Sequence, residues 1–154
     1  MYPILLFFHS LFRWLVLSSL VYAIARAYRG LRSARPFTKT DNSIRHWTAT
    51  IAHIQLMLGC VLYFISPVIK QLFADLKRSI TCKELTFFGI VHMALMLTAI
   101  VLITIGSALA KRKTASEDKF RTMLRWFTIA LALIFIAVPW PFSPFANRPL
   151  FRTF

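Results

Sequence analysis

The long apolar stretches of this chain contain four side chains that could carry chemistry, namely His9, Arg13, His53 and His92. An imidazole can ligate a metal ion or transfer a proton, and a guanidinium binds anions and carbonyl oxygens. Such groups are costly in an apolar environment, since an arginine at the centre of a bilayer costs roughly 2.5–3.5 kcal/mol. Their positions therefore predict a binding site enclosed between helices.

His9 and His92 fall at the same depth if the chain crosses a membrane up and down. Each lies about five residues, or roughly 7 Å, from the middle of its apolar stretch and on the same side of it. Two axial ligands of one haem need equal depth because the iron lies midway between them. We therefore expect His9 and His92 to ligate haem iron, with His53, which falls in the other half of the membrane, as the alternative ligand.

Arg13 lies near the predicted centre of the first span, about 15 Å along the helix. Its functional interpretation is contact with an anionic or carbonyl-bearing guest, such as a haem propionate, a quinone oxygen or a lipid phosphate. Hydrogen bonds to backbone carbonyls or polar side chains, or snorkelling to the interface, are the ordinary alternatives. No acidic residue lies within an apolar stretch, because all five belong to connections or helix ends.

Other polar and soft side chains in these stretches have ordinary interpretations. Gln55 is typical of an interhelical hydrogen bond, and His46, beside Trp47, is typical of an interfacial anchor. Met57 and Met96 could also ligate haem iron, but the histidines are preferred as ligands.

The elements that must position these residues are four apolar stretches. The chain has 154 residues, of which 58% are hydrophobic, and its mean hydropathy is +0.64. A hydrocarbon core of roughly 30 Å requires about 20 helical residues, and lipid satisfies no open backbone group. The sequence thus predicts an all-α integral membrane protein, a four-helix up-down bundle that forms one transmembrane domain over residues 1–154. The expected spans are 3–25, 47–69, 85–110 and 122–141, followed by an interfacial tail at 142–154.

Turn and cap signals separate the predicted spans. Asp41, Asn42 and Ser43 are N-cap candidates for the second helix. Ser66 and Pro67 indicate a kink or an early exit, after which residues 71–76 could form a short interfacial helix. The first stretch has no basic residue ahead of it and no clear cleavage site, so we expect a retained span rather than a signal peptide.

The formal net charge of +14 would suggest nucleic-acid binding in a soluble chain. In a membrane protein the positions of the charges matter instead, and we expect no nucleic-acid partner. The connections 26–45 and 111–125 together hold twelve Lys and Arg residues, against six in 70–84 and 142–154. Because basic residues are retained on the cytoplasmic side, both termini are expected to face outward.

Several segments resemble one family across nearly the whole chain. They are HSLFRWLVL at 9–17, RHWTATIAHIQLMLGCVLYFISP at 45–67, HMALMLTAIVLITIGSALAKR at 92–112 and PWPF at 139–142. Together they resemble small bacterial four-helix membrane proteins that are labelled cytochrome b. The resemblance implies a multi-pass protein of the bacterial inner, cytoplasmic membrane.

The resemblance also implies a haem b held by histidines, with His9, Arg13, His53 and His92 at the matching positions. In place of the glutamate expected directly before the third-helix histidine, this chain has Val91. That difference removes a carboxylate that could have paired with Arg13 or served a proton path.

Two functions remain open at this point. The first is a cytochrome b-like, haem-binding protein for electron transfer within the membrane. The alternative is a non-catalytic structural subunit of a larger membrane complex that binds lipid or quinone. Either role favours an electron carrier or a subunit over a stand-alone enzyme. The expected partners are the lipid bilayer and either another membrane protein or a second copy of the chain.

Overall fold

The computed structural model describes residues 1–143 and 146. Among them it contains helices and loops but no strand, so the prediction of an all-α protein is confirmed. The elements in chain order are α1 (Tyr2–Arg32), α2 (Lys39–Ile65), α3 (Pro67–Ala74), α4 (Leu76–Ser79), α5 (Lys83–Thr86), the π-helix η1 (Phe87–Val91), α6 (His92–Arg112) and α7 (Ser116–Ala137).

Four helical segments are long and apolar enough to cross a membrane: α1, α2, the continuous segment Lys83–Arg112 and α7. This pattern identifies a multi-pass membrane protein. Each segment extends beyond its predicted apolar stretch at the end that carries the basic connections. Arg and Lys have high helix propensity, so the helix continues past the point where the apolar residues stop. The fourth helix ends at Ala137, before Pro139, which favours an extended residue ahead of it. The predicted interfacial tail lies largely outside the described residues.

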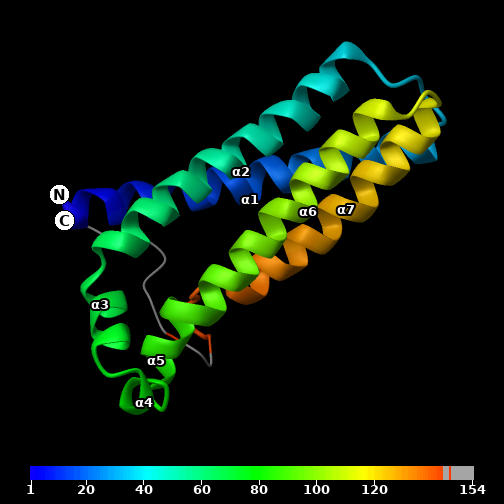
Figure 1. Ribbon diagram of the computed structural model, residues 1–154. Helices are drawn as coiled ribbons and strands as arrows, with labels where there is room; N and C mark the ends of the chain where they lie inside the picture. The colour runs from blue at the N-terminus through cyan, green and yellow to red at the C-terminus, as the bar shows by residue number, and fades with distance from the viewer. Residues whose placement is uncertain (144–145, 147–154) are drawn as a thin grey trace.

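The four long helices pack as two antiparallel pairs (Figure 1). Helix α1 packs chiefly against α2 and α7, whereas α6 packs against α7 and α2. Helices α1 and α6 are therefore diagonal neighbours across the bundle. The pairs α1–α2 and α6–α7 converge at the end with the connections 33–38 and 113–115, and they diverge toward the end bridged by α3, α4 and α5.

Helix α2 begins earlier than predicted, at Lys39, and its N-cap is Thr38 rather than Asp41, Asn42 or Ser43. The Thr38 hydroxyl accepts a hydrogen bond from Asp41 N at 3.3 Å, and the Asp41 carboxylate accepts one from Thr38 N at 3.0 Å. This reciprocal capping box satisfies two backbone donors at once. The prediction of the N-cap was wrong because Asp41 completes the capping box from the third position of the helix, while Thr38 is the cap itself.

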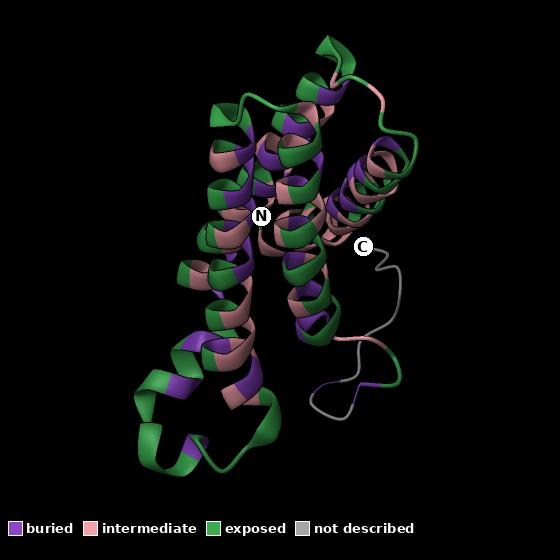
Figure 2. Cartoon of the chain, turned by 90° about the vertical axis from the view of Figure 1, so that its right-hand side faces the viewer, coloured by how far each residue is buried: buried purple, intermediate pink, exposed green. Residues whose placement is uncertain are grey.

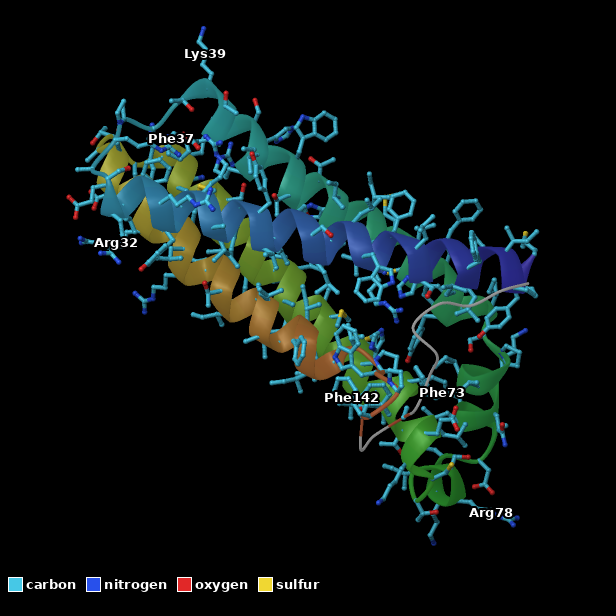
Figure 3. The ribbon with its side chains drawn as sticks, turned by 180° about the vertical axis from the view of Figure 1, so that it is seen from behind. Arg32, Phe37, Lys39, Phe73, Arg78 and Phe142 are labelled. Carbon is cyan, nitrogen blue, oxygen red and sulfur yellow. The ribbon has the colours of Figure 1, made fainter. Side chains whose placement is uncertain are left out.

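Asp41 also ties α1 to the start of α2. Its carboxylate is 1% exposed and accepts hydrogen bonds from Arg26 Nε at 2.9 Å and from both terminal nitrogens of Arg35 at 2.6 and 2.9 Å. The bond to Asp41 raises the pKa of the Arg35 guanidinium above its ordinary value. Figure 3 shows Phe37 directed among the helices at this end, while Lys39 and Arg32 point away from them.

The predicted break at Ser66 and Pro67 is where α2 ends and the short helix α3 begins. Helix α3 folds back on η1, where a side chain at Gly89 would meet Leu72. Tyr63 of α2 donates a hydrogen bond to the Gly89 carbonyl at 2.9 Å. These contacts hold the π-helix, an element often found at functional sites, immediately before His92.

The packed core occupies the converging half of the bundle, and Figure 2 shows buried residues along the inner faces of the helices. All buried residues of α1 lie within 16–30, and those of α6 lie within 99–110. In α2 they lie within 41–52, apart from Leu62. The other half, which holds His9, Arg13 and His92, therefore contains no fully buried residue of α1 or α6.

Close approach of α6 and α7 requires a glycine at residue 106. A Cβ there would collide with the side chain of Trp126 at its own Cβ, an atom that no rotamer change can move. We expect Gly106→Ala to lower the free energy of unfolding by about 1–3 kcal/mol, as overpacking does in other cores. Unfolding in mild detergent titrated with SDS would measure the change. Ala132→Leu, at an exposed position on α7, is the control, and equal stability of the two variants would contradict the prediction.

Candidate functional site

His9 is held on α1 by two residues of α2. The amide Nε2 of Gln55 donates to the His9 carbonyl at 3.0 Å and lies 3.3 Å from His9 Nε2. Gly59 lies one turn further along α2, and a Cβ there would come within 3.3 Å of the His9 ring. Glycine at this position therefore leaves room for the imidazole against α2.

His92 is held on α6 by the end of α7. Its Nδ1 lies 2.8 Å from the carbonyl oxygen of Ala137, in the last turn, where carbonyls have no partner within the helix. A carbonyl only accepts, so Nδ1 carries the proton and the neutral ring keeps a lone pair on Nε2. The rings of Phe87 and Phe88 lie 5.8 and 6.2 Å from the His92 ring.

The structure brings His9, His92 and Arg13 together. His9 interacts electrostatically with both other side chains, and His92 interacts with Arg13. The two histidines come from the diagonal helices α1 and α6 rather than from one helix pair. The positive charge of Arg13 acts on both imidazoles.

Aromatic side chains border this group. The Arg13 guanidinium lies 5.5 Å from the ring of Trp14, which contacts Trp140 edge-on at 6.0 Å. Trp140 Nε1 donates to the Phe135 carbonyl at 2.8 Å, and its ring stacks on Phe142. These contacts connect the middle of α1 to the end of α7 and line one side of the site with flat, apolar surface.

His53 lies elsewhere, in a pocket between α2 and α6. Its Nδ1 lies 2.7 Å from the Ala49 carbonyl, and its Nε2 lies 3.1 Å from the hydroxyl of Thr104. The pocket has a volume of about 280 Å³ and is also lined by Arg45 and Lys111. The structure thus separates the third histidine from His9 and His92.

Two buried polar atoms at this contact, His9 Nδ1 and Gln55 Oε1, have no hydrogen-bond partner among the described residues. When Nε2 accepts from the Gln55 amide, Nδ1 carries the proton, so one donor and one acceptor are left open next to each other. Buried polar groups normally have hydrogen-bond partners, so an unsatisfied donor and acceptor side by side are typical of a site that binds a ligand.

The two histidines could ligate the iron of a haem, though they are unequally prepared for it. The hydrogen bond to Ala137 leaves Nε2 of His92 open and fixes the ring, which is the usual support of a metal-ligating histidine. Nε2 of His9 is released if Gln55 keeps only its shorter bond to the His9 carbonyl. No cluster of three or more His, Cys, Asp or Glu that could hold a metal ion occurs in the described part of the chain.

Two features of this site were not predicted from the sequence. Gln55 makes the interhelical hydrogen bond expected of it, but only the antiparallel register of α1 and α2 determines that its partner is His9. The Ala137 carbonyl is a backbone group, and every residue type has one, so the sequence could not single it out.

In comparisons with known proteins, no family model, no curated protein and no solved structure matches the chain.

Proposed function

We propose that this protein binds haem b between His9 of α1 and His92 of α6 and transfers electrons within the membrane. The observation that carries the proposal is the electrostatic interaction of two histidines from diagonal helices, one of which donates a hydrogen bond from Nδ1 to the Ala137 carbonyl. Bound haem b supplies a one-electron couple between its ferric and ferrous forms. The protein holds the macrocycle at a fixed depth and sets its potential.

The residues of the chain divide this work among them. His92 is the rigid ligand, because a hydrogen bond and two phenylalanine rings fix its orientation. His9 completes the coordination from α1. Arg13 stabilises negative charge, either on the propionates or gained by the iron on reduction. The fully buried residues of α1 and α6 all lie in the other half of the bundle, so the half that holds His9 and His92 is packed less tightly.

Haem content after expression with an ample haem supply tests the proposal. The detergent-purified protein is expected to be red, with a Soret band and about one haem per chain, as two axial histidines imply. A colourless preparation without iron would contradict the proposal. Exposed surface residues, such as Gln71, offer control positions whose replacement leaves the spectrum unchanged.

A second candidate function, a subunit that binds quinone, is favoured by the open donor at His9 Nδ1 and the open acceptor at Gln55 Oε1. A quinone oxygen could accept a hydrogen bond from His9 Nδ1, and a quinol hydroxyl could donate one to Gln55 Oε1. Gln55→Leu is then expected to weaken binding of a short-chain quinone about tenfold, since a hydrogen-bonding site discriminates strongly. Tryptophan fluorescence quenching measures the affinity, with Gln71→Leu as the control. An equal affinity of the two variants would exclude this candidate.

The proposed location is the bacterial cytoplasmic membrane, with both termini outward. It is supported by the excess of basic residues in the connections 26–45 and 111–125, which lie at the same end of the bundle. Large apolar side chains are exposed along the outer faces, among them Met57, Phe64 and Ile136. They suit contact with lipid, with another membrane protein or with a second copy of the chain.

A further inference from the structure

The pocket between α2 and α6 carries positive charge. Its polar lining comes from Arg45, His46, Thr50 and His53 of α2 and from Thr104, Ser107 and Lys111 of α6. No acidic side chain of the described residues lines it. This pocket lies at the converging end of the bundle, and it shares no residue with the group formed by His9, Arg13 and His92.

Arg45 is a buried cation with neutral partners. It is 5% exposed, and its Nε and Nη2 both donate to the side-chain oxygen of Asn42 at 3.2 and 3.0 Å. Nη1 donates to the Ser107 carbonyl at 3.0 Å and to the Ser107 hydroxyl. These bonds use four of the five guanidinium hydrogens, and none of the acceptors is charged. Burying a charge without a counter-charge is costly, so the site favours an anion.

Lys111 supplies a second cation at the mouth of the pocket. It is exposed, and no described acidic residue forms an ion pair with it. The one buried carboxylate at this end, Asp41, is already bonded to Arg26 and Arg35. An ammonium on a flexible stem can contact an anion directly, while the buried Arg45 guanidinium contributes its charge.

The pocket lies at the level expected for lipid headgroups. Trp47 follows the lining residue His46 along α2 and is 59% exposed, and tryptophan marks the membrane–water interface. Arg112 and Lys113 continue the basic surface just beyond it. Basic pockets between transmembrane helices at this level recognise phosphate-bearing headgroups.

We propose that this pocket binds a phosphate group. Arg45 and Lys111 supply the charge, and the Ser107 hydroxyl, whose oxygen accepts from Arg45, and the His46 imidazole can donate hydrogen bonds. The phosphate belongs either to an anionic lipid headgroup or to a soluble phosphorylated compound, and both present the same charged oxygens to the same side chains. The site is independent of the haem proposal because the two sets of residues do not overlap.

The experiment compares the full-length protein with Lys111→Gln and, as a matched control, Arg112→Gln. Both variants remove one exposed positive charge at the end of α6, but only the first changes the pocket. One arm measures lipid retention by native mass spectrometry from nanodiscs of phosphatidylglycerol and phosphatidylcholine, at about 0.15 M salt to screen distant charges. The other arm measures thermal protection by inorganic phosphate in neutral detergent, with chloride at matched ionic strength.

The wild type is expected to retain phosphatidylglycerol over phosphatidylcholine or to be protected by phosphate. Lys111→Gln should weaken that effect about tenfold or more, as loss of a charge-assisted hydrogen bond does, whereas Arg112→Gln should change it by a few-fold at most. Retention of lipid alone assigns the site to a headgroup, and protection by phosphate alone assigns it to a soluble compound. Equal losses in the two variants, or no effect in either arm, would overturn the proposal.

Discussion

Replacing His92 by alanine is expected to lower the haem content of the purified protein at least about tenfold. Changes in the groups that merely support a metal ligand cost about 10–100-fold in metal affinity, and loss of the ligand itself should cost no less. His92 is the better fixed of the two histidines, since Ala137, Phe87 and Phe88 all hold its ring. Haem per chain, measured as the pyridine haemochromogen, gives the result.

His53→Ala is the matched control for this variant. It removes an imidazole of the same size from the bundle, but from the pocket between α2 and α6. Its haem content should equal that of the wild type. The fold should survive in both variants, because an interhelical hydrogen bond in a membrane contributes only about 0.6 kcal/mol on average. The assignment of His92 fails if His53→Ala loses haem and His92→Ala does not.

The second large effect is expected at Asp41, whose replacement by asparagine should lower the free energy of unfolding by about 2–3 kcal/mol. Breaking a fully buried ion pair costs roughly 3–5 kcal/mol, but Arg26 and Arg35 reach solvent, which reduces the loss. Asparagine keeps the size of the side chain and removes the charge that both guanidiniums share. Titration with SDS, followed by circular dichroism, measures the stability.

Glu117→Gln is the control for Asp41. Glu117 pairs with Arg121 one turn along α7, and both side chains are 66% exposed. Exposed pairs of this kind contribute about 0.5 kcal/mol or less. If the two variants were destabilised to the same extent, the carboxylate of Asp41 would not have the role in joining α1 to α2 that its contacts indicate.

The amino-acid sequence was sufficient for the number and order of the long helices, because hydrocarbon imposes their length and their composition. It was less informative at their ends. Hydropathy marks where the apolar stretch stops, whereas the helix continues through Arg26 and Arg32 to its physical cap. At Thr38 the cap depends on a reciprocal pair of hydrogen bonds, which composition alone did not single out from the neighbouring Asp41.

The sequence could suggest the charged and imidazole members of the candidate site but not their supporting groups. Counting along the chain predicts one depth for His9 and His92, and in the structure the two side chains interact electrostatically. The role of Gln55 depends on the axial register of α1 and α2, and the role of the Ala137 carbonyl depends on where α7 ends relative to α6. The sequence does not give either of these. The basic pocket was missed for the same reason, since Arg45 and Lys111 belong to different helices.

The pairing of His9 with His92 on one iron is tested most directly by electron paramagnetic resonance of the ferric protein, recorded for the wild type and for His9→Ala. The proposal predicts a six-coordinate, low-spin signal for the wild type, because His9 and His92 would both ligate the iron. His9→Ala, in which His92 remains, should shift to a five-coordinate, high-spin signal. An unchanged six-coordinate signal in His9→Ala would contradict the pairing.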